Sequence, residues 1–141
     1  MSLWSSVRRL LGLRESAAAG QRTISYRPRH NRQADPGEVV WASVDFDDGS
    51  GRKDRPVLIV GRQGRRTVLG LMLSTQEKRE RQSAWLPIGA GAWDKLNRPS
   101  YVRLDRVLEL DPARIRREGS VLDRQRSEYV AHALRTRHGW R

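Results

Sequence analysis

Short apolar runs separated by turn residues constrain the fold more than any other feature of this 141-residue sequence. The longest of these runs, such as Val57–Val60, contain only four residues. Polar, glycine-rich stretches such as Asp47–Asp54 and Gly61–Arg65 lie between them. A membrane-spanning helix needs about 20 apolar residues, so no such helix is expected. Short apolar segments joined by turn chemistry predict instead a small, strongly bent antiparallel sheet or barrel around one core.

The segment 36–138 is expected to form one domain that is mainly β with helices, of the α+β class. Glu77–Gln82 is expected to be a charged loop or a helical turn. Trp41 is expected to lie in the core, because a tryptophan in a small β domain is usually buried. The expected strands are Glu38–Phe46, Pro56–Val60, Thr67–Leu73, Ala84–Ile88 and Tyr101–Val107.

Two helix signals follow the strands. The pair Asp111-Pro112 indicates a helix start, with the aspartate as N-cap. A last helix is predicted over about 121–137, with Ser120 and Asp123 as capping residues and Gly139 as its stop. The apolar face expected for this helix consists of Leu122, Tyr129, Val130, Ala133 and Leu134.

Residues 1–35 have a different character. Apolar residues from Leu3 to Leu11 recur at helical spacing and predict a short amphipathic helix. The stretch Gln21–Gln33 is polar and rich in arginine, with little to bury, and is expected to be a mobile basic arm that a partner orders. No continuous apolar region typical of a signal peptide is present, and one short helix is too small for firm membrane binding.

The charge balance points to a polyanionic partner. The chain has 28 basic and 16 acidic residues, for a formal net charge of +12. Only Lys53, Lys78 and Lys95 are lysines, which leaves 25 arginines. Arginine suits phosphate recognition, although a GC-rich genome also favours arginine over lysine. The absence of cysteine excludes disulfides and thiolate chemistry, and three scattered histidines are too few for a metal site.

Four segments, in order, carry a resemblance to a known family. Gly37–Trp41 opens the first strand, and Arg55–Val60 forms an Arg-Pro-initiated apolar strand. The triplet Ser74–Gln76 ends the third strand, and Ser100–Asp105 lies in a later one. Their order, spacing and content resemble the PemK/MazF family of toxins from type II toxin–antitoxin systems. The resemblance covers about residues 36–135.

The resemblance implies an SH3-like antiparallel barrel with a C-terminal helix, in a protein that forms homodimers. The absence of cysteine and of a membrane-spanning run separately predicts a cytoplasmic protein. The resemblance also implies cleavage of single-stranded RNA without a metal or cofactor, and silencing by a cognate antitoxin protein. Such a ribonuclease uses the substrate 2′-hydroxyl as nucleophile, and needs a proton acceptor, a proton donor and cations. Two alternatives remain open: a non-catalytic nucleic-acid-binding module on the same barrel, for RNA or DNA, and, less favoured, a gyrase-directed toxin.

Three residues are the main catalytic candidates. Arg55 resembles the essential arginine that the family is implied to use for transition-state phosphate; otherwise it is a surface arginine paired with a nearby aspartate. Arg103 and Asp105 lie two apart on the predicted strand, so their side chains share a face. The resemblance implies an acid/base pair there, in which we expect Arg103 to act electrostatically and Asp105 as the base. The alternative is ordinary polar alternation on a half-exposed strand.

Ser74 and Thr75 are expected to position the reacting phosphate, or otherwise to cap the turn that follows the third strand. The loop 47–54 lacks the His-Glu or Ser-Glu found in many family members. Asp47, Asp48 or Asp54 are expected to substitute only if this loop closes over the RNA. The remaining RNA-binding candidates are Arg52, Lys53, Gln76, Lys78, Arg79 and Trp85.

Overall fold

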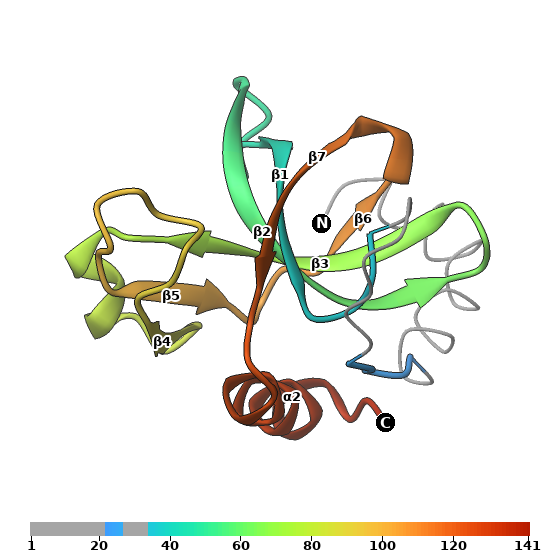
Figure 1. The fold of residues 1–141 in the computed structure, drawn as a ribbon. Coiled ribbons are helices and arrows are strands. Elements are labelled where there is room, and N and C mark those ends of the chain that lie inside the picture. The colour runs from blue at the N-terminus through green and yellow to red at the C-terminus, as the bar shows by residue number, and fades with distance from the viewer. Residues whose placement is uncertain (1–21, 27–33) are drawn as a thin grey trace.

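A bent sheet of seven antiparallel strands forms the centre of the protein (Figure 1). The computed structural model describes residues 22–26 and 34–141. The sheet order is β4-β5-β3-β2-β1-β7, and β6 also pairs with β3. The mainly β fold with a C-terminal helix is therefore confirmed. The strands are β1 (Glu38–Asp45), β2 (Arg52–Gln63), β3 (Thr67–Ser74), β4 (Trp85–Gly89), β5 (Ser100–Arg103), β6 (Leu108–Leu110) and β7 (Ile115–Val121).

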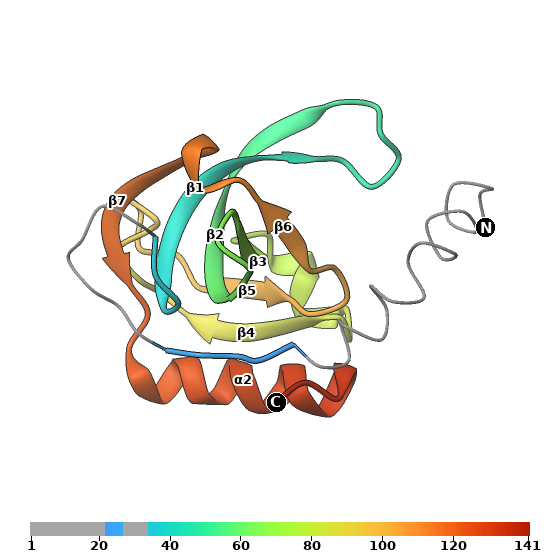
Figure 2. The same ribbon diagram turned by 90° about the vertical axis from the view of Figure 1, so that its right-hand side faces the viewer.

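The centres of strands β2 and β3 are apolar because both faces of the sheet are covered there. Leu58 and Val60 of β2 belong to one core cluster, whereas Val57 and Ile59 belong to a second cluster. Successive residues of a strand point to opposite faces, so these clusters lie on the two sides of the sheet. The first cluster also contains Leu134 of the C-terminal helix α2 (Arg124–His138). Figure 2 shows this helix running along one side of the sheet.

Helix α2 begins later than predicted and ends as predicted. Its N-cap is Asp123, which accepts a hydrogen bond from the Arg126 backbone N–H, and it ends at Gly139 with a left-handed φ of 70°. At the C-terminal end, Gly139 can adopt this positive φ because glycine has no side chain. Tyr129 was expected on the buried face, but 49% of it is exposed. In the described part of the chain, no helix is long and apolar enough to cross a membrane.

Several strand boundaries differ from the sequence-based expectation. The predicted strand Tyr101–Val107 ends at Arg103, as part of β5, which pairs with the end of β3. Residues 104–107 form no strand, and the separate strand β6 pairs with the beginning of β3. Strand β2 begins at Arg52, inside the predicted turn. Strand β7 was not predicted; it lies at the sheet edge beside β1, where backbone pairing does not require an apolar pattern. The predicted helix start at Asp111 is confirmed as a three-residue 3-10 helix, η2 (Pro112–Arg114).

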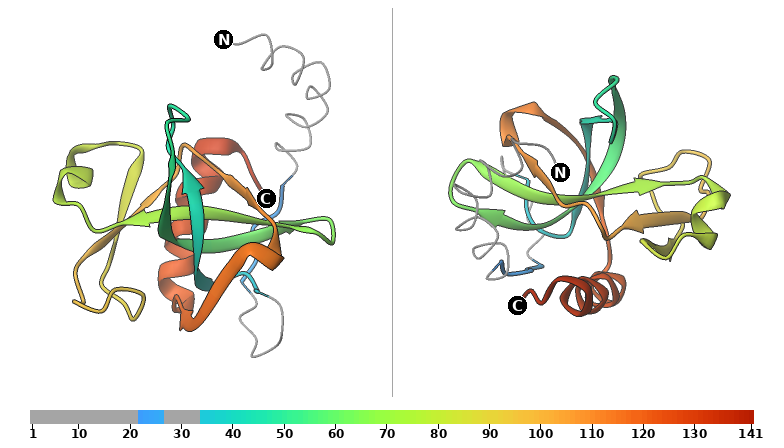
Figure 3. Two further views of the ribbon diagram at one scale, coloured as in Figure 1. Left: turned by 90° about the horizontal axis from the view of Figure 1, so that it is seen from above. Right: turned by 180° about the vertical axis from the view of Figure 1, so that it is seen from behind.

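Residues 22–26 pack against the domain, unlike the mobile arm expected there. The Ser25 backbone N–H donates to the Val60 carbonyl at 2.9 Å, and that of Ile24 donates to the Arg141 carbonyl at 2.7 Å. A Cβ on Gly61 would lie 2.7 Å from the Thr23 carbonyl oxygen, so glycine allows this close approach. Figure 2 shows the segment between β4 and α2, and Figure 3 shows it beside the C-terminus. The predicted helix at 3–11 lies outside the described residues.

Candidate functional site

Arg103 is the centre of a cluster of charged side chains at the end of β5. Its Nη1 and Nη2 donate to Oδ1 and Oδ2 of Asp47 at 2.9 and 2.8 Å. Its Nε donates to Oδ1 of Asp105 at 2.5 Å. Arg106 donates to Oδ1 of Asp47 at 2.9 Å and to the Asp45 carbonyl at 2.7 Å. The turn after β1 is therefore tied to the chain just after β5, across 56 residues of sequence.

The expected proximity of Arg103 and Asp105 is found, but for a different reason. Strand β5 ends at Arg103, so Asp105 does not share a strand face with it. Its carboxylate instead reaches the guanidinium from the turn that follows the strand. Arg106 was not among the sequence candidates, because nothing local distinguishes it from the other arginines.

The ion pairs determine the protonation states in this cluster. The hydrogen bond from Arg103 lowers the pKa of Asp47 and of Asp105 below their ordinary values. The same contacts, first with Asp47, raise the pKa of Arg103. Both carboxylates are therefore ionised at neutral pH, and the guanidinium is a fixed cation.

Arg79 and Arg55 add positive charge beside this cluster. Arg79 lies on the 3-10 helix η1 (Glu77–Arg81), with its guanidinium carbon 4.4 Å from the centre of the Trp85 ring. The guanidinium of Arg103 is 6.0 Å from the centre of the same ring. Burial, and then the charges of Arg55 and Arg103, lower the pKa of Arg79. The side chain of Arg55 makes no hydrogen bond or ion pair with any residue that the structure describes.

The hydroxyl candidates lie at the end of β3, next to this group. Ser74 pairs with Tyr101 of β5 and is buried, and its Oγ accepts the Gln76 backbone N–H at 3.2 Å. Thr75 is half-buried and Gln76 is exposed. The chain then enters η1, which carries Lys78 and Arg79. The Ser74 hydroxyl thus caps the turn that leads to Arg79.

The three loop aspartates have different partners. Asp47 alone reaches Arg103. Asp48 accepts the Ser50 backbone N–H within its own turn, and Asp54 pairs with Arg116. Of the substitutes considered for the missing His-Glu pair, Asp47 is therefore the one placed in the cluster.

The remaining RNA-binding candidates are spread around the site. Arg52 is exposed and pairs with Asp45 at 3.1 Å, and Lys53 is exposed on β2. Trp85 is only 7% exposed, so it is not available to stack on an RNA base. Its ring instead supports the guanidinium of Arg79. Trp41 was expected in the core but is only half-buried, and the guanidinium of Arg116 lies over its ring.

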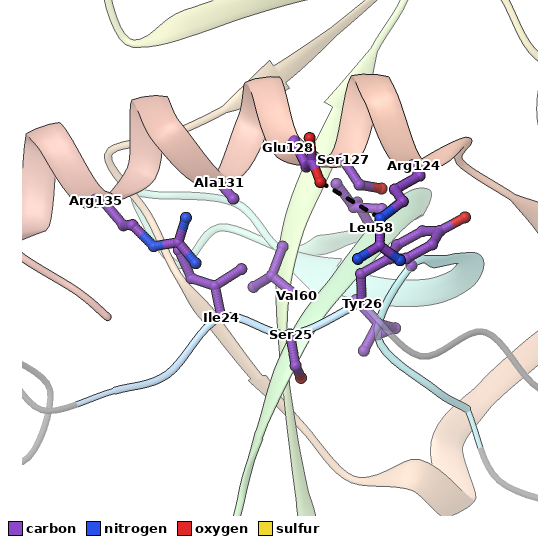
Figure 4. A pocket seen from close by; sticks show the side chains of 12 residues that line it. Ile24, Ser25, Tyr26, Leu58, Val60, Arg124, Ser127, Glu128, Ala131 and Arg135 are labelled. Carbon is purple, nitrogen blue, oxygen red and sulfur yellow. Dashed lines mark ion pairs between the residues drawn. The ribbon is translucent and has the colours of Figure 1, made fainter.

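A pocket of about 390 Å³ lies elsewhere, between the segment 22–26, β2 and α2 (Figure 4). Leu58 and Val60 contribute apolar side chains to it, and Arg124 pairs with Glu128 at its rim. It shares no residue with the arginine cluster. Among the described residues, no group of three or more histidine, aspartate or glutamate side chains is placed to hold a metal ion.

The fold and the sequence both resemble known toxins. A solved structure described as MazE-MazF (Form-II) from Deinococcus radiodurans contains a chain with the same fold, at a TM-score of 0.55 and 17% sequence identity. The match covers 82% of the present chain and 98% of the other. A comparison with curated protein sequences yields no match. The family model for the PemK-like, MazF-like toxin of type II toxin–antitoxin systems matches residues 35–137. The chain that carries the Arg103 cluster therefore belongs to the PemK-like, MazF-like family of type II toxins.

Proposed function

We propose that this toxin is a sequence-selective endoribonuclease that cleaves single-stranded RNA through the substrate 2′-hydroxyl. The observation that carries the proposal is the group formed by Arg103, Arg55 and Arg79 beside the carboxylates of Asp105 and Asp47. Guanidinium groups stabilise the charge that develops on phosphate oxygens, and a carboxylate accepts a proton. Membership of a toxin family supports the same conclusion.

The reaction starts with attack of the 2′-oxygen on the adjacent phosphorus. Asp105 accepts the 2′-hydroxyl proton, and Arg55 and Arg103 neutralise the charge on the non-bridging oxygens. The bond from phosphorus to the 5′-oxygen then breaks, and this oxygen takes a proton from water. Asp105 gives its proton to the resulting hydroxide, which restores the water and the carboxylate. The products are a 2′,3′-cyclic phosphate and a 5′-hydroxyl. DNA has no 2′-hydroxyl and is not cleaved.

Phosphate binding prepares Asp105 for this role. A general base works best when its pKa is near the operating pH, and in the free protein Arg103 holds the pKa of Asp105 low. When an RNA phosphate takes over the hydrogen bonds of Arg103, Asp105 loses this stabilising partner. Its pKa then rises, and the carboxylate becomes a stronger base.

The proposal includes the partners of the toxin. The net charge of +12 favours single-stranded RNA and an acidic antitoxin, and the two compete for the arginine surface. We further propose a homodimer that acts in the cytoplasm. A dimer increases the basic surface available to one RNA strand.

The test is cleavage of a long single-stranded RNA in the presence of EDTA, with mapping of the product ends. Wild type should cut at specific sites, and DNA of the same sequence should stay intact. Arg55→Ala should lower the rate about 100-fold, the scale expected for loss of one group that stabilises transition-state charge. Arg65→Ala, which alters an exposed arginine in the β2–β3 turn, is the matched control and should cleave normally.

RNA that is bound but left intact would refute the nuclease and favour the non-catalytic binding module. If the Arg55→Ala and Arg65→Ala variants cleave RNA equally fast, the role of Arg55 is refuted but the nuclease activity is not.

A further inference from the structure

Arg79 differs from the other basic residues of η1. Lys78 and Arg81 are exposed, whereas Arg79 is half-buried with its guanidinium over the indole of Trp85. Its Nη1 donates to Oε1 of Gln82 at 2.8 Å. The side chain is thus fixed in one place by an aromatic ring and a hydrogen bond, as expected of a group that receives a ligand.

One donor of this fixed side chain has no acceptor. The Nε of Arg79 is buried and has no hydrogen-bond partner among the described residues. A buried donor without a partner is destabilising, and more so when the group is charged. Unlike Arg103, Arg79 forms no ion pair with a carboxylate in the described part of the chain. The free protein therefore leaves this cation incompletely compensated.

The neighbouring positive charges favour the binding of an anion at Arg79. Arg103 lies at the same indole as Arg79, and the charge of Arg55 also acts on Arg79. Both charges lower the pKa of Arg79, in addition to the effect of burial. Of the three guanidinium groups, only that of Arg103 is paired with carboxylates. An anion bound among them relieves the repulsion between the guanidinium groups.

The geometry of the donors selects phosphate among anions. A guanidinium presents a planar fork of N–H groups that matches two oxygens of a phosphate, and several forks together suit its tetrahedral oxygens. The Trp85 ring lies under the Arg79 guanidinium and limits its movement. A fixed fork loses little side-chain entropy when it binds.

We propose that Arg79 is a further catalytic residue of this site, which binds the scissile phosphodiester together with Arg55 and Arg103 by donating from its terminal Nη groups. This inference rests on the proposed RNA substrate, but the binding of phosphate to Arg79 does not require that the protein cleave RNA. Trp85 and Gln82 act through Arg79 and are positioning residues.

The first test observes the Arg79 guanidinium through its Nε–H group. The arginine Nε–H signals of the full-length protein are recorded by NMR, and the Arg79 signal is assigned by its loss in Arg79→Lys. Titration with inorganic phosphate should shift the Arg79 signal, while that of Arg98, which already pairs with Asp94, should stay unchanged. An Arg79 signal that does not move over the full titration would overturn the proposal.

The second test measures RNA cleavage. Arg79→Met keeps an unbranched side chain on the indole but removes the charge and the donors, and should lower kcat/KM at least tenfold, mainly through kcat. Arg81→Met removes the same charge from an exposed position of η1 and is the matched control. Arg79→Lys retains the charge without the fork and should restore only part of the rate.

The outcomes separate the two claims. If wild type does not cleave RNA, the proposed nuclease is wrong, and the phosphate titration still decides whether Arg79 binds phosphate. If wild type cleaves and Arg79→Met behaves like Arg81→Met, the role of Arg79 is wrong and the nuclease stands. If Arg79→Met fails to fold, Arg79→Lys is measured in its place. Full activity of Arg79→Lys would overturn the proposal that the guanidinium N–H groups of Arg79 bind the phosphodiester.

Discussion

Replacement of Asp47 by asparagine tests whether the β1–β2 turn competes with RNA for Arg103. In the free protein the Asp47 carboxylate accepts two hydrogen bonds from Arg103 and one from Arg106. These are the donors that an RNA phosphate requires. Asp47→Asn keeps the size of the side chain but removes its charge, so we expect it to release Arg103 and tighten RNA binding.

The size of this effect follows from the exposure of the pair. The Asp47 side chain is 59% exposed and that of Arg103 is 18% exposed. Exposed ion pairs contribute about 0–1 kcal/mol, and the two-pronged contact with a third bond from Arg106 favours the upper end of this range. A gain of about 1 kcal/mol corresponds to an affinity about fivefold tighter, since 1.4 kcal/mol is tenfold.

The assay is fluorescence anisotropy at fixed salt, with a labelled single-stranded RNA whose 2′-hydroxyls are all methylated. This probe has no nucleophile, so binding is measured without cleavage. Asp48→Asn is the matched control, because it removes the same charge from the same turn, where the carboxylate accepts from Ser50 and pairs with no described arginine. The control should alter the affinity less than twofold. If Asp47→Asn binds no tighter than Asp48→Asn, the competition argument fails.

Three further predictions concern stability. Glu38→Ala removes a buried carboxylate that pairs with Arg117 at 2.6 Å, and should lower the free energy of unfolding by about 3–5 kcal/mol in urea titrations. Ser100→Ala removes the acceptor of the buried Trp93 indole N–H at 2.8 Å, and should lower it by about 1–3 kcal/mol; a smaller loss would mean that another acceptor replaces the hydroxyl. Because the folded-state pKa of Asp105 is lowered, its contribution to stability is complete above the unfolded pKa of about 4 and is lost as the pH falls through the folded value. The stability difference between wild type and Asp105→Asn should therefore be constant from pH 5 to 7 and shrink below about pH 4, whereas a difference unaffected by acid would show that the ion pair does not stabilise the fold.

The sequence predicted best those elements whose buried positions are occupied by apolar residues. Strands β2 and β3 lie between two core clusters, so nearly every position in their centres is apolar. The end of α2 was predicted because Gly139 has a positive φ that few other residues adopt. By contrast, β7 is an edge strand with the sequence IRREGSV, held by backbone pairing with β1, and no side-chain pattern signals it.

The site was only partly predictable because its contacts join distant parts of the chain. Arg103 and Asp105 are near neighbours in sequence and were found together. The contact of Arg103 with Asp47 depends on how the β1–β2 turn meets the end of β5. From sequence, the three aspartates of the predicted loop 47–54 could not be ranked, because their different partners are known only from the fold. Only tertiary structure decides such a choice.

Ion pairs divide the described arginines into paired and unpaired ones, a distinction that composition cannot make. Arg98 and Arg116 are exposed and paired with Asp94 and Asp54, so their charges are largely cancelled close to the surface. Such pairs attract RNA weakly, because a distant phosphate meets a cation and an anion together. Arg55 and Arg79 lack a carboxylate partner among the described residues and lie beside the cluster of Arg103. Two guanidinium groups without a carboxylate partner thus lie where the proposed chemistry occurs, and their local charge adds to the general attraction from the net +12 in steering a phosphate to the site.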